Sequence, residues 1–238
     1  RSSDLPALVD IREGPKVLIS EANLFDYPGM YLRGDVEPHT LKGKFPRVVV
    51  KDTLRSDRDL LPVERADYIA RTPGKRSFPW RVIAIAPEDK TIITNQMVFL
   101  LSEPSRIEDP SWIKPGKVAW DWWNYNNIYE VPFEAGINTE TYKYYIDFAA
   151  DHGIEYIILD EGWYELGDLT AINPDIDMPA LIAYAREKGV GVILWVVWKT
   201  LDDQLELVVP IFEAWGVAGL KVDFMQRDDQ WMVNYYWK

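Results

Sequence analysis

Short hydrophobic runs separated by turn residues characterise the first hundred residues of the chain. Alternating or β-branched residues make up these runs, and Pro, Gly and Asp residues interrupt them, as in the stretch 87–89. Period-two alternation bounded by turn residues is typical of β-strands. The pattern predicts strands at 16–19, 47–50, 81–86 and 91–101. Residues 1–101 are therefore predicted to form a sandwich-like β domain, and the Pro-rich polar stretch 102–116 a linker.

After Gly116 the hydrophobic pattern changes to strands and helices that alternate at a near-constant interval. Continuous apolar runs predict four strands, and segments with helical periodicity predict three helices between them. The strands are predicted at 117–123, 154–160, 190–198 and 217–224, and the helices at 139–152, 178–188 and 202–215. Four βα units with apolar strands predict a parallel sheet covered by helices, either a closed eight-stranded barrel or an open doubly wound sheet.

Polar residues at the strand ends distinguish these two architectures. Each predicted strand ends at or just before such residues, namely Asp121, then Asp160 with Glu161, then Lys199, then Asp223. A barrel builds its active site from the ends of several strands, whereas an open sheet usually carries a Gly-rich phosphate loop, which this sequence lacks. A barrel is favoured, and it normally takes about 250 residues. Residues 117–238 then hold the first four βα units of an incomplete (β/α)8 barrel, and we expect the chain to be a piece of a longer protein.

The amino-acid composition limits which partners and which catalytic groups the protein can use. The chain has 238 residues, a formal net charge of -12, no Cys and 2 His. This charge excludes a general nucleic-acid partner, and the absence of Cys excludes disulfides and Cys-ligated zinc. We expect no membrane partner, because no apolar run approaches the length of a spanning helix. Chemistry must then rest on carboxylates, amines and aromatic rings, and 11 Trp residues offer flat surfaces for packing in the core or against sugar rings.

Lys221 and Asp223 are the strongest candidates for chemistry. They are two positions apart on a predicted strand, so both side chains point to the same face. A buried ion pair that only fixes strand register is the structural alternative. Near the mouth of a barrel, however, a carboxylate kept ionised by an ammonium group is a good nucleophile toward an anomeric carbon. We favour the functional interpretation.

Other strand ends supply candidate substrate contacts. Asp160 and Glu161, followed by Gly and Trp, suit a pocket that accepts hydrogen bonds from hydroxyl groups, although helix capping is an alternative. Alternation along 120–123 sends Asp121 and Trp123 to one face of the first strand, where they are either ligand contacts or core. Lys199 ends an otherwise apolar strand and requires a partner.

The stretch 19–29 of the β domain groups Glu21, Asn23 and Asp26. Oxygen ligands of this kind can bind calcium, but a complete site needs six to eight oxygens. On local grounds a polar turn is the favoured interpretation.

Taken together, these segments resemble glycoside hydrolase family 97 along essentially the whole chain. The resemblance rests on five segments in order: SEANLFDYPG, FPWRVI, SWIKPGKVAWDWWN, LDEGWY and GLKVDF. It implies an N-terminal β-super-sandwich, a (β/α)8 catalytic barrel and a small C-terminal β domain. This chain would hold the end of the first domain and the first half of the second.

The resemblance also implies roles for individual residues. Asp223 matches the nucleophile of the retaining members, whereas inverting members keep a Glu base at the position where this chain has Lys199. The acid/base Glu of the family lies on a later strand, outside this chain. Glu21 matches a calcium ligand, and its partners again lie downstream. From their places at the strand ends, and not from the resemblance, we expect Asp121, Trp123, Glu161, Lys199 and Lys221 to bind the substrate.

We therefore expect a calcium-dependent retaining α-galactosidase that acts on terminal α-galactosides. The resemblance implies a periplasmic or secreted protein. Two alternatives remain, namely an inverting α-glucosidase of the same family and a non-catalytic sugar-binding module.

Overall fold

The computed structural model describes residues 2–35, 37–56 and 58–238. Contacts divide the chain into two compact units. Unit 1 comprises Arg1–Thr53, Leu60–Glu108 and Met225–Lys238, and unit 2 comprises Leu54–Asp59 and Asp109–Phe224. These units are defined by contacts in space, whereas the predicted boundaries at 101 and 116 describe the order of domains along the chain. The boundaries stay a prediction.

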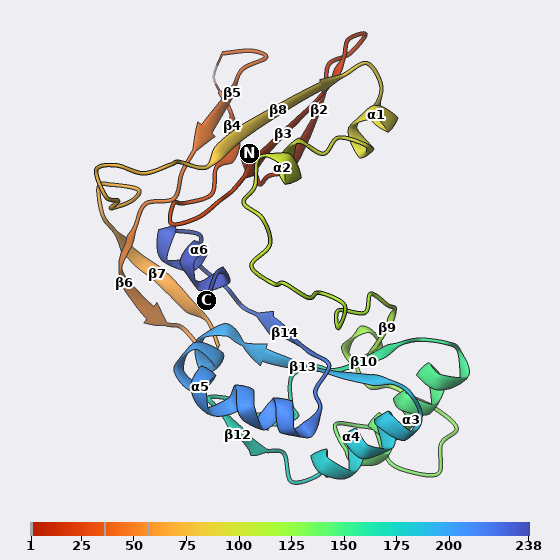
Figure 1. The fold of residues 1–238 in the computed structure, drawn as a ribbon. Helices are drawn as coiled ribbons and strands as arrows, with labels where there is room; N and C mark the ends of the chain where they lie inside the picture. The colour runs from red at the N-terminus through yellow and green to blue at the C-terminus, as the bar shows by residue number, and fades with distance from the viewer. Residues whose placement is uncertain (1, 36, 57) are drawn as a thin grey trace. The chain divides into compact units, whose positions relative to one another are not determined.

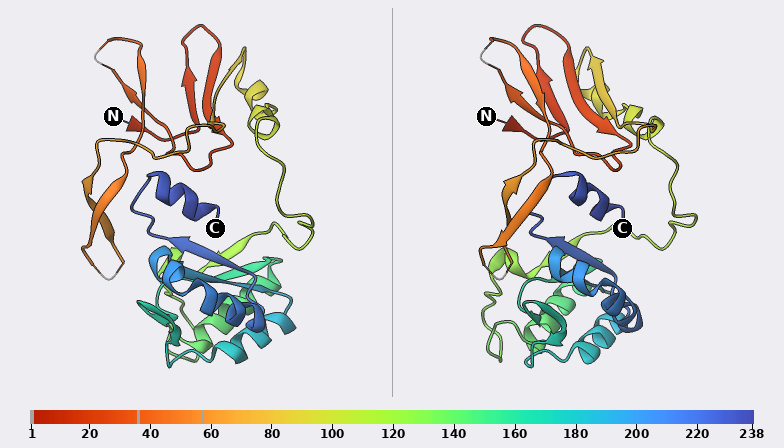
Figure 2. Two further views of the ribbon diagram at one scale, coloured as in Figure 1. Left: turned by 60° about the vertical axis from the view of Figure 1, so that its left-hand side comes forward. Right: turned by 90° about the vertical axis from the view of Figure 1, so that its left-hand side faces the viewer.

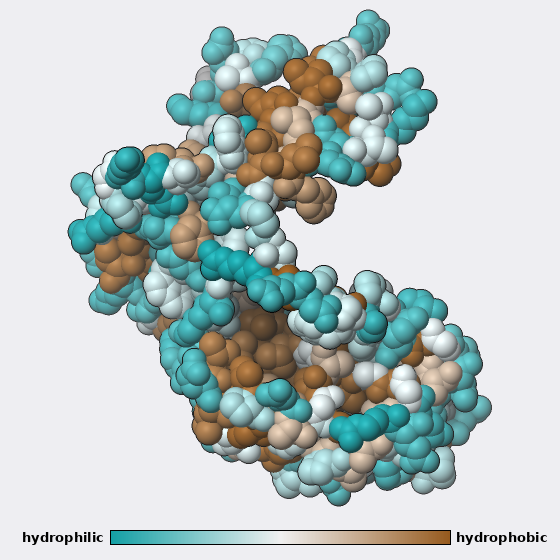
Figure 3. Space-filling model, in the orientation of Figure 1, coloured by the Kyte–Doolittle hydropathy of each residue, from teal (hydrophilic) through white to brown (hydrophobic). Residues whose placement is uncertain are grey.

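Unit 1 is built mainly from short strands, as predicted (Figure 1). Among the described residues its strands form three small sheets, ordered β1-β4-β5, β2-β3-β8 and β6-β7. The strands are β1 Ser2–Ser3, β2 Ala7–Asp10, β3 Lys16–Ala22, β4 Tyr31–Gly34, β5 Leu41–Lys44, β6 Val49–Leu54, β7 Leu60–Arg65 and β8 Trp80–Ala86. Strand β8 alternates buried Val82 and Ala84 with exposed Ile83 and Ile85, so one face of its sheet packs inward. Hydrophobic residues also reach the visible surface of both units (Figure 3).

The predicted strand at 91–101 is wrong. The structure has two short helices there, α1 Asp89–Ile93 and α2 Met97–Leu100. The polar residues between them interrupt the hydrophobic run, and the side chain of Asn95 accepts a 3.0 Å hydrogen bond from the backbone N–H of Met97. Such local side-chain bonds satisfy a helix start and compete with strand pairing.

Unit 2 contains a four-stranded parallel sheet in the order β9-β10-β13-β14. The strands are β9 Val118–Trp120, β10 Tyr156–Leu159, β13 Gly191–Val197 and β14 Gly219–Asp223. Their order follows the chain without a reversal, as in the strands of a (β/α)8 barrel. An open doubly wound sheet would show a switch point, which this segment lacks among the residues described.

Three helices cover one side of this sheet (Figures 1 and 2). They are α3 Thr139–Asp151, α4 Met178–Glu187 and α5 Trp198–Trp215. Asn138 and Asp177 cap the first two helices by accepting backbone hydrogen bonds, and Gly216 ends the third in a left-handed conformation. Their buried faces and the sheet share one hydrophobic core that includes Ile146, Leu181 and other apolar residues. This core holds the sheet in place, and the polar residues discussed below lie at the carboxyl ends of its strands.

The remaining elements differ from the predictions mainly at their ends. Helix α5 begins at Trp198, earlier than the predicted residue 202. A 3-10 helix at Asp121–Asn124, labelled η1, replaces the end of the first predicted strand. The hairpin of β11 Tyr164–Glu165 and β12 Asp168–Ile172 was not predicted. Helix α6 Gln230–Tyr236 follows β14 along the chain.

Within the described part of the chain, no helix combines the length and the hydrophobicity that a membrane crossing requires.

Candidate active site

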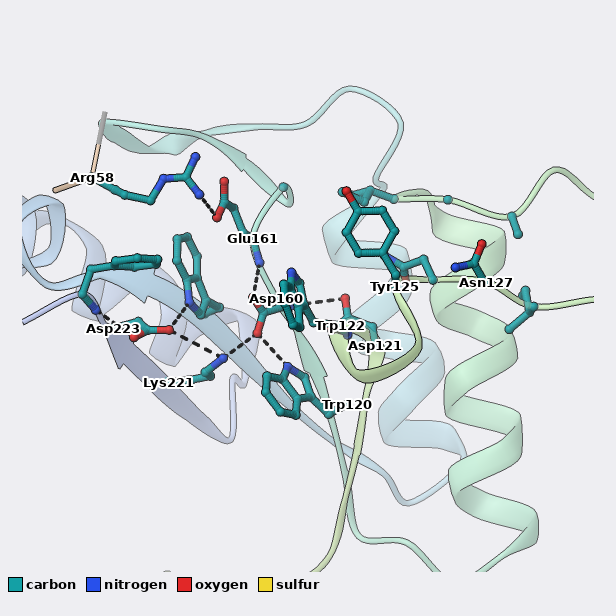
Figure 4. Close-up of a pocket in the computed structure, with 18 residues that line it drawn as sticks. Arg58, Trp120, Asp121, Trp122, Tyr125, Asn127, Asp160, Glu161, Lys221 and Asp223 are labelled. Atoms are coloured by element: carbon teal, nitrogen blue, oxygen red, sulfur yellow. Dashed lines mark hydrogen bonds and ion pairs between the residues drawn. The ribbon is translucent and has the colours of Figure 1, made fainter. Parts of the chain in front are cut away.

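A pocket of about 880 Å³ opens at the carboxyl ends of the parallel strands in unit 2 (Figure 4). Its lining includes five of the residues selected from the sequence, namely Asp121, Asp160, Glu161, Lys221 and Asp223. These residues follow or end strands β9, β10 and β14, so the parallel register of the sheet brings them to one edge. The expected meeting of polar strand ends is observed.

Lys221 joins two strand ends electrostatically. Because Lys221 and Asp223 alternate on β14, both side chains reach the pocket. The Nζ atom of Lys221 lies 2.6 Å from Oδ2 of Asp160 and 3.7 Å from Oδ2 of Asp223. The same ammonium group lies 4.4 Å from the ring centre of Trp120. Its charge therefore acts on two carboxylates and on an aromatic face.

Asp223 is held as a carboxylate. Trp195 Nε1 donates a 3.0 Å hydrogen bond to Oδ2, and the backbone N–H of Phe224 donates a 2.8 Å bond to Oδ1. Burial alone would raise the pKa of Asp223, but these hydrogen bonds and the charge of Lys221 outweigh it and lower the pKa. The backbone of Phe224 is left-handed, with φ of 62°, which is rare for a bulky residue and is found at functional sites. An ionised carboxylate facing a pocket is a candidate nucleophile.

Asp121 lies behind Asp160 and is 1% exposed. It accepts hydrogen bonds from the Tyr142 hydroxyl at 3.0 Å, from the backbone N–H of Trp122 at 2.7 Å and from the backbone N–H of Asp160 at 3.2 Å. Burial raises the pKa of Asp121 to about 6, although these hydrogen bonds oppose it. Asp160 in turn accepts a 2.7 Å bond from Nε1 of Trp120. Asp121 therefore lines the pocket and anchors the end of β10 through the backbone of Asp160.

Glu161 forms an ion pair with Arg58, a residue that the sequence analysis missed (Figure 4). Arg58 belongs to the turn between β6 and β7, which contacts group with unit 2. Its guanidinium also lies 5.8 Å from the ring centre of Phe224. No local pattern identifies Arg58, because it stands in a polar turn far from Glu161 in the sequence.

Among the described residues, the pocket lining does not include Trp123 or Lys199. After Trp120 the chain enters the 3-10 helix, which ends strand alternation, so Trp120 and Trp122 stack in the pocket wall while Trp123 is 82% exposed. The expectation that Lys199 ends a strand is wrong, because it lies in the first turn of α5 and pairs with Asp203.

Glu21 lies in unit 1 on strand β3, paired with Arg81 of β8. Its Oε2 accepts a 2.9 Å hydrogen bond from the backbone N–H of Met30. Its Oε1 is buried without a hydrogen bond of good geometry, although Arg81 Nη1 lies 2.9 Å away. Burial raises the pKa of Glu21, while the bond from Met30 and the charge of Arg81 oppose that rise. A cation would therefore compete with Arg81 for Oε1, and calcium needs six to eight oxygen ligands in all.

No group of three or more metal-ligating side chains stands close enough to hold an ion in the parts of the chain that the structure covers. Among the described residues, therefore, Glu21 has no cluster of His, Cys, Asp or Glu partners with which to complete a calcium site.

The fold and pocket define a class of protein. A parallel sheet in chain order, with carboxylates, an ammonium group and indole rings at its strand ends, is typical of barrel enzymes that bind sugars. Comparison with known families identifies the particular one. The glycosyl-hydrolase 97 N-terminal model matches residues 1–104, and the glycoside hydrolase 97 model matches residues 122–238. The chain belongs to glycoside hydrolase family 97, as the sequence analysis predicted.

Two curated relatives are similar along the chain. The chain is 43% identical to the retaining alpha-galactosidase of Bacteroides thetaiotaomicron, over 98% of this chain and 36% of that protein. It is 34% identical to the probable retaining alpha-galactosidase of Streptomyces bingchenggensis, over 71% of this chain and 27% of that protein. The chain therefore spans about a third of the length of these relatives.

A solved family 97 enzyme from Pseudoalteromonas sp. strain K8, in complex with acarbose, has the same fold. The TM-score is 0.76 at 24% identity, and the match covers 99% of this chain and 38% of that one. The chain thus holds the family's N-terminal domain segment followed by the start of its catalytic domain.

Proposed function

We propose that the protein to which this chain belongs is a retaining α-galactosidase, with Asp223 as its nucleophile. The observation that carries the proposal is the Asp223 carboxylate, which lines the pocket with its pKa lowered by Trp195, Phe224 and Lys221 against the effect of burial. The retaining alpha-galactosidase names of the two curated relatives support the choice of substrate and stereochemistry. Four further βα units outside this chain would close the barrel.

The proposed reaction is a double displacement. An Asp223 oxygen attacks the anomeric carbon while the bond to the leaving oxygen breaks, and an acid outside this chain protonates that oxygen. Water then attacks the same carbon and releases Asp223, so the configuration at the anomeric carbon is retained. The two carboxyl groups should stand about 5 to 5.5 Å apart. Lys221, Asp160 and Glu161 would bind sugar hydroxyls, and the Trp120 ring would form a wall of the pocket.

Replacement of the proposed nucleophile tests this mechanism. In the full-length protein, Asp223→Gly should abolish turnover of an aryl α-galactoside, and added azide should restore part of it. NMR of the first sugar released should show the α-anomer. A β-anomer as first product would exclude retention, and unimpaired turnover by the variant would exclude Asp223 as nucleophile. Lys199→Met tests the contact predicted for Lys199, and unchanged kcat/KM would agree with its place on α5 outside the pocket lining.

Two assays separate the predicted alternatives. Faster hydrolysis of α-glucosides than of α-galactosides, with inversion, would support the α-glucosidase. Galactose binding in calorimetry without any hydrolysis would support the sugar-binding module.

We further propose that Glu21 supplies one ligand of a calcium ion, the others coming from segments outside this chain. The buried Oε1 atom without a well-oriented hydrogen bond supports this role. Glu21→Gln should lower the calcium content of the full-length protein after dialysis, measured by elemental analysis, whereas the exposed Glu64→Gln should not. Equal calcium contents would refute the role. Location in the periplasm or outside the cell stays a prediction, which cell fractionation would test.

A further inference from the structure

The turn between β6 and β7 belongs to a different compact unit from the strands that it connects. Residues Leu54–Asp59 group with unit 2, whereas most of β6 and all of β7 belong to unit 1. The turn contributes Arg58 to the lining of the pocket. A residue from the β-rich part of the sequence therefore forms part of a site otherwise built from βα units.

Arg58 contacts two residues of the pocket, Glu161 and Phe224. Its guanidinium forms an ion pair with Glu161, and the two side chains are 26% and 27% exposed. It also lies over the ring of Phe224, the residue that follows Asp223. A guanidinium group presents its donors in a rigid planar fork, so an ion pair with a carboxylate fixes orientation as well as charge.

Arg58 holds the side chain of Glu161 through this ion pair. Its backbone N–H donates a 2.9 Å hydrogen bond to Oδ1 of Asp160, which fixes the main chain. The next residue, Gly162, is in a positive-φ conformation with φ of 116°, so no regular element continues through this point. A carboxylate offers about four acceptor positions, and one ion pair leaves others available to hydroxyl groups in the pocket.

We propose that Arg58 is a positioning residue for Glu161. It holds the Glu161 carboxylate in the orientation that accepts a hydrogen bond from one hydroxyl group of the bound sugar. The turn between β6 and β7 thereby helps to determine which sugar the barrel accepts. This inference rests on the proposed α-galactosidase function and names the device by which one part of that site is oriented.

Deoxy substrates provide the test. Aryl α-galactosides lacking one hydroxyl at a time are assayed with the full-length wild type, Arg58→Met, Arg58→Lys, Glu161→Gln and the double variant. In the wild type, removing the hydroxyl that binds Glu161 should lower kcat/KM. In Arg58→Met and in Glu161→Gln, removing that same hydroxyl should no longer lower kcat/KM. Both single variants should also lose about tenfold to a hundredfold in kcat/KM for the substrate with all its hydroxyl groups, because that is the worth of one hydrogen bond to a charged group. The double variant should lose no more than either single one, and Arg58→Lys should be intermediate.

Arg55→Met is the matched control. Arg55 belongs to the same turn, pairs with Asp59 at 2.6 Å and has a side chain that is 67% exposed. It does not line the pocket among the described residues. Its replacement should leave both kcat/KM and the deoxy pattern close to those of the wild type.

Three results would overturn the inference. A lower melting temperature with an unchanged deoxy pattern in Arg58→Met would make Arg58 merely structural. Losses that multiply in the double variant would mean that Arg58 acts independently of Glu161. Equal effects of Arg55→Met and Arg58→Met would assign the effect to the turn as a whole. Absence of α-galactoside hydrolysis by the wild type would instead refute the proposed function, on which the inference depends.

Discussion

Replacing Trp195 by phenylalanine removes the indole N–H that donates to Oδ2 of Asp223. Phe keeps an aromatic ring in the buried site on β13, where Trp195 is 1% exposed. The carboxylate of Asp223 retains the bond from the backbone of Phe224 and the charge of Lys221. The substitution therefore tests one hydrogen bond to the proposed nucleophile.

The expected shift follows from the strength of that bond. A hydrogen bond to a charged group contributes about 1.5 to 3 kcal/mol, and one pKa unit corresponds to about 1.4 kcal/mol. Loss of the bond would therefore raise the pKa of Asp223, because Trp195 is one of the groups that lower it. Because the Asp223 side chain is 41% exposed, water replaces part of the lost bond, so the free-energy change should lie toward the lower end of this range.

The sign of the effect on activity is then fixed. Asp223 attacks as a carboxylate, so kcat/KM falls as the pH falls through its pKa. A raised pKa moves the acid limb of the profile to higher pH. The assay is kcat/KM for an aryl α-galactoside as a function of pH, with the full-length Trp195→Phe enzyme.

Trp198→Phe is the matched control, because Trp198 is also buried but does not line the pocket among the described residues. Its acid limb should coincide with that of the wild type. An unshifted limb in a folded Trp195→Phe enzyme would refute the claim that this indole lowers the pKa of Asp223.

Three further variants probe other features of the two units. Because burial raises the pKa of Asp121 to about 6, the folded state favours its neutral form, so wild-type stability should fall as pH rises from about 4 to about 6. Asp121→Asn should reduce that slope in urea unfolding. Asp229→Asn removes a fully buried carboxylate that accepts two hydrogen bonds from Arg227 and should cost about 3 to 5 kcal/mol, seen as a lower melting temperature. Gly162→Ala would place a Cβ atom 2.4 Å from Cδ1 of Ile137 at a positive φ, so it should displace the Glu161 loop and lower kcat/KM.

Asp229→Asn and Gly162→Ala each have a matched control variant. Asp228→Asn breaks an exposed pair with Arg65 and should cost less than about 1 kcal/mol. Gly167→Ala shares the strain of a positive φ of 99° but meets no atom within 4 Å, so kcat/KM should stay close to wild type. Equal effects of Asp228→Asn and Asp229→Asn, or of the two Gly variants, would contradict these explanations. An unchanged pH slope in Asp121→Asn would contradict the raised pKa.

The parallel sheet and the core of its site were predictable because they depend on periodicity. Alternation along one strand brings Lys221 and Asp223 to the same face, and parallel pairing brings Asp160 to the same edge. Both facts can be deduced without coordinates, and the structure agrees with them. The same reasoning placed Asp121 in the pocket, although its hydrogen bond to Tyr142 needed the fold.

The two predicted contacts that lie outside the pocket lining, Trp123 and Lys199, stand where regular structure ends. Trp123 was assigned by alternation that a 3-10 helix interrupts, and Lys199 by a strand that has already become α5. Element ends depend on capping and packing, which leave weak sequence signals. The sequence gives no sign that Arg58 belongs to the site. Its partner Glu161 lies 103 positions away, and their pairing depends on the path of the turn between β6 and β7.

That path has a consequence for chimeras of this family. The stretch 102–116, which the sequence predicts to be a linker, is the obvious junction for exchanging the β-rich part between relatives, yet the turn Leu54–Asp59 would travel with that part. A hybrid joined there would acquire a foreign residue opposite Glu161 while keeping its own nucleophile. Parents matched at positions 58 and 161 should therefore recombine with activity, and mismatched parents should yield hybrids that fold but have impaired sugar selection.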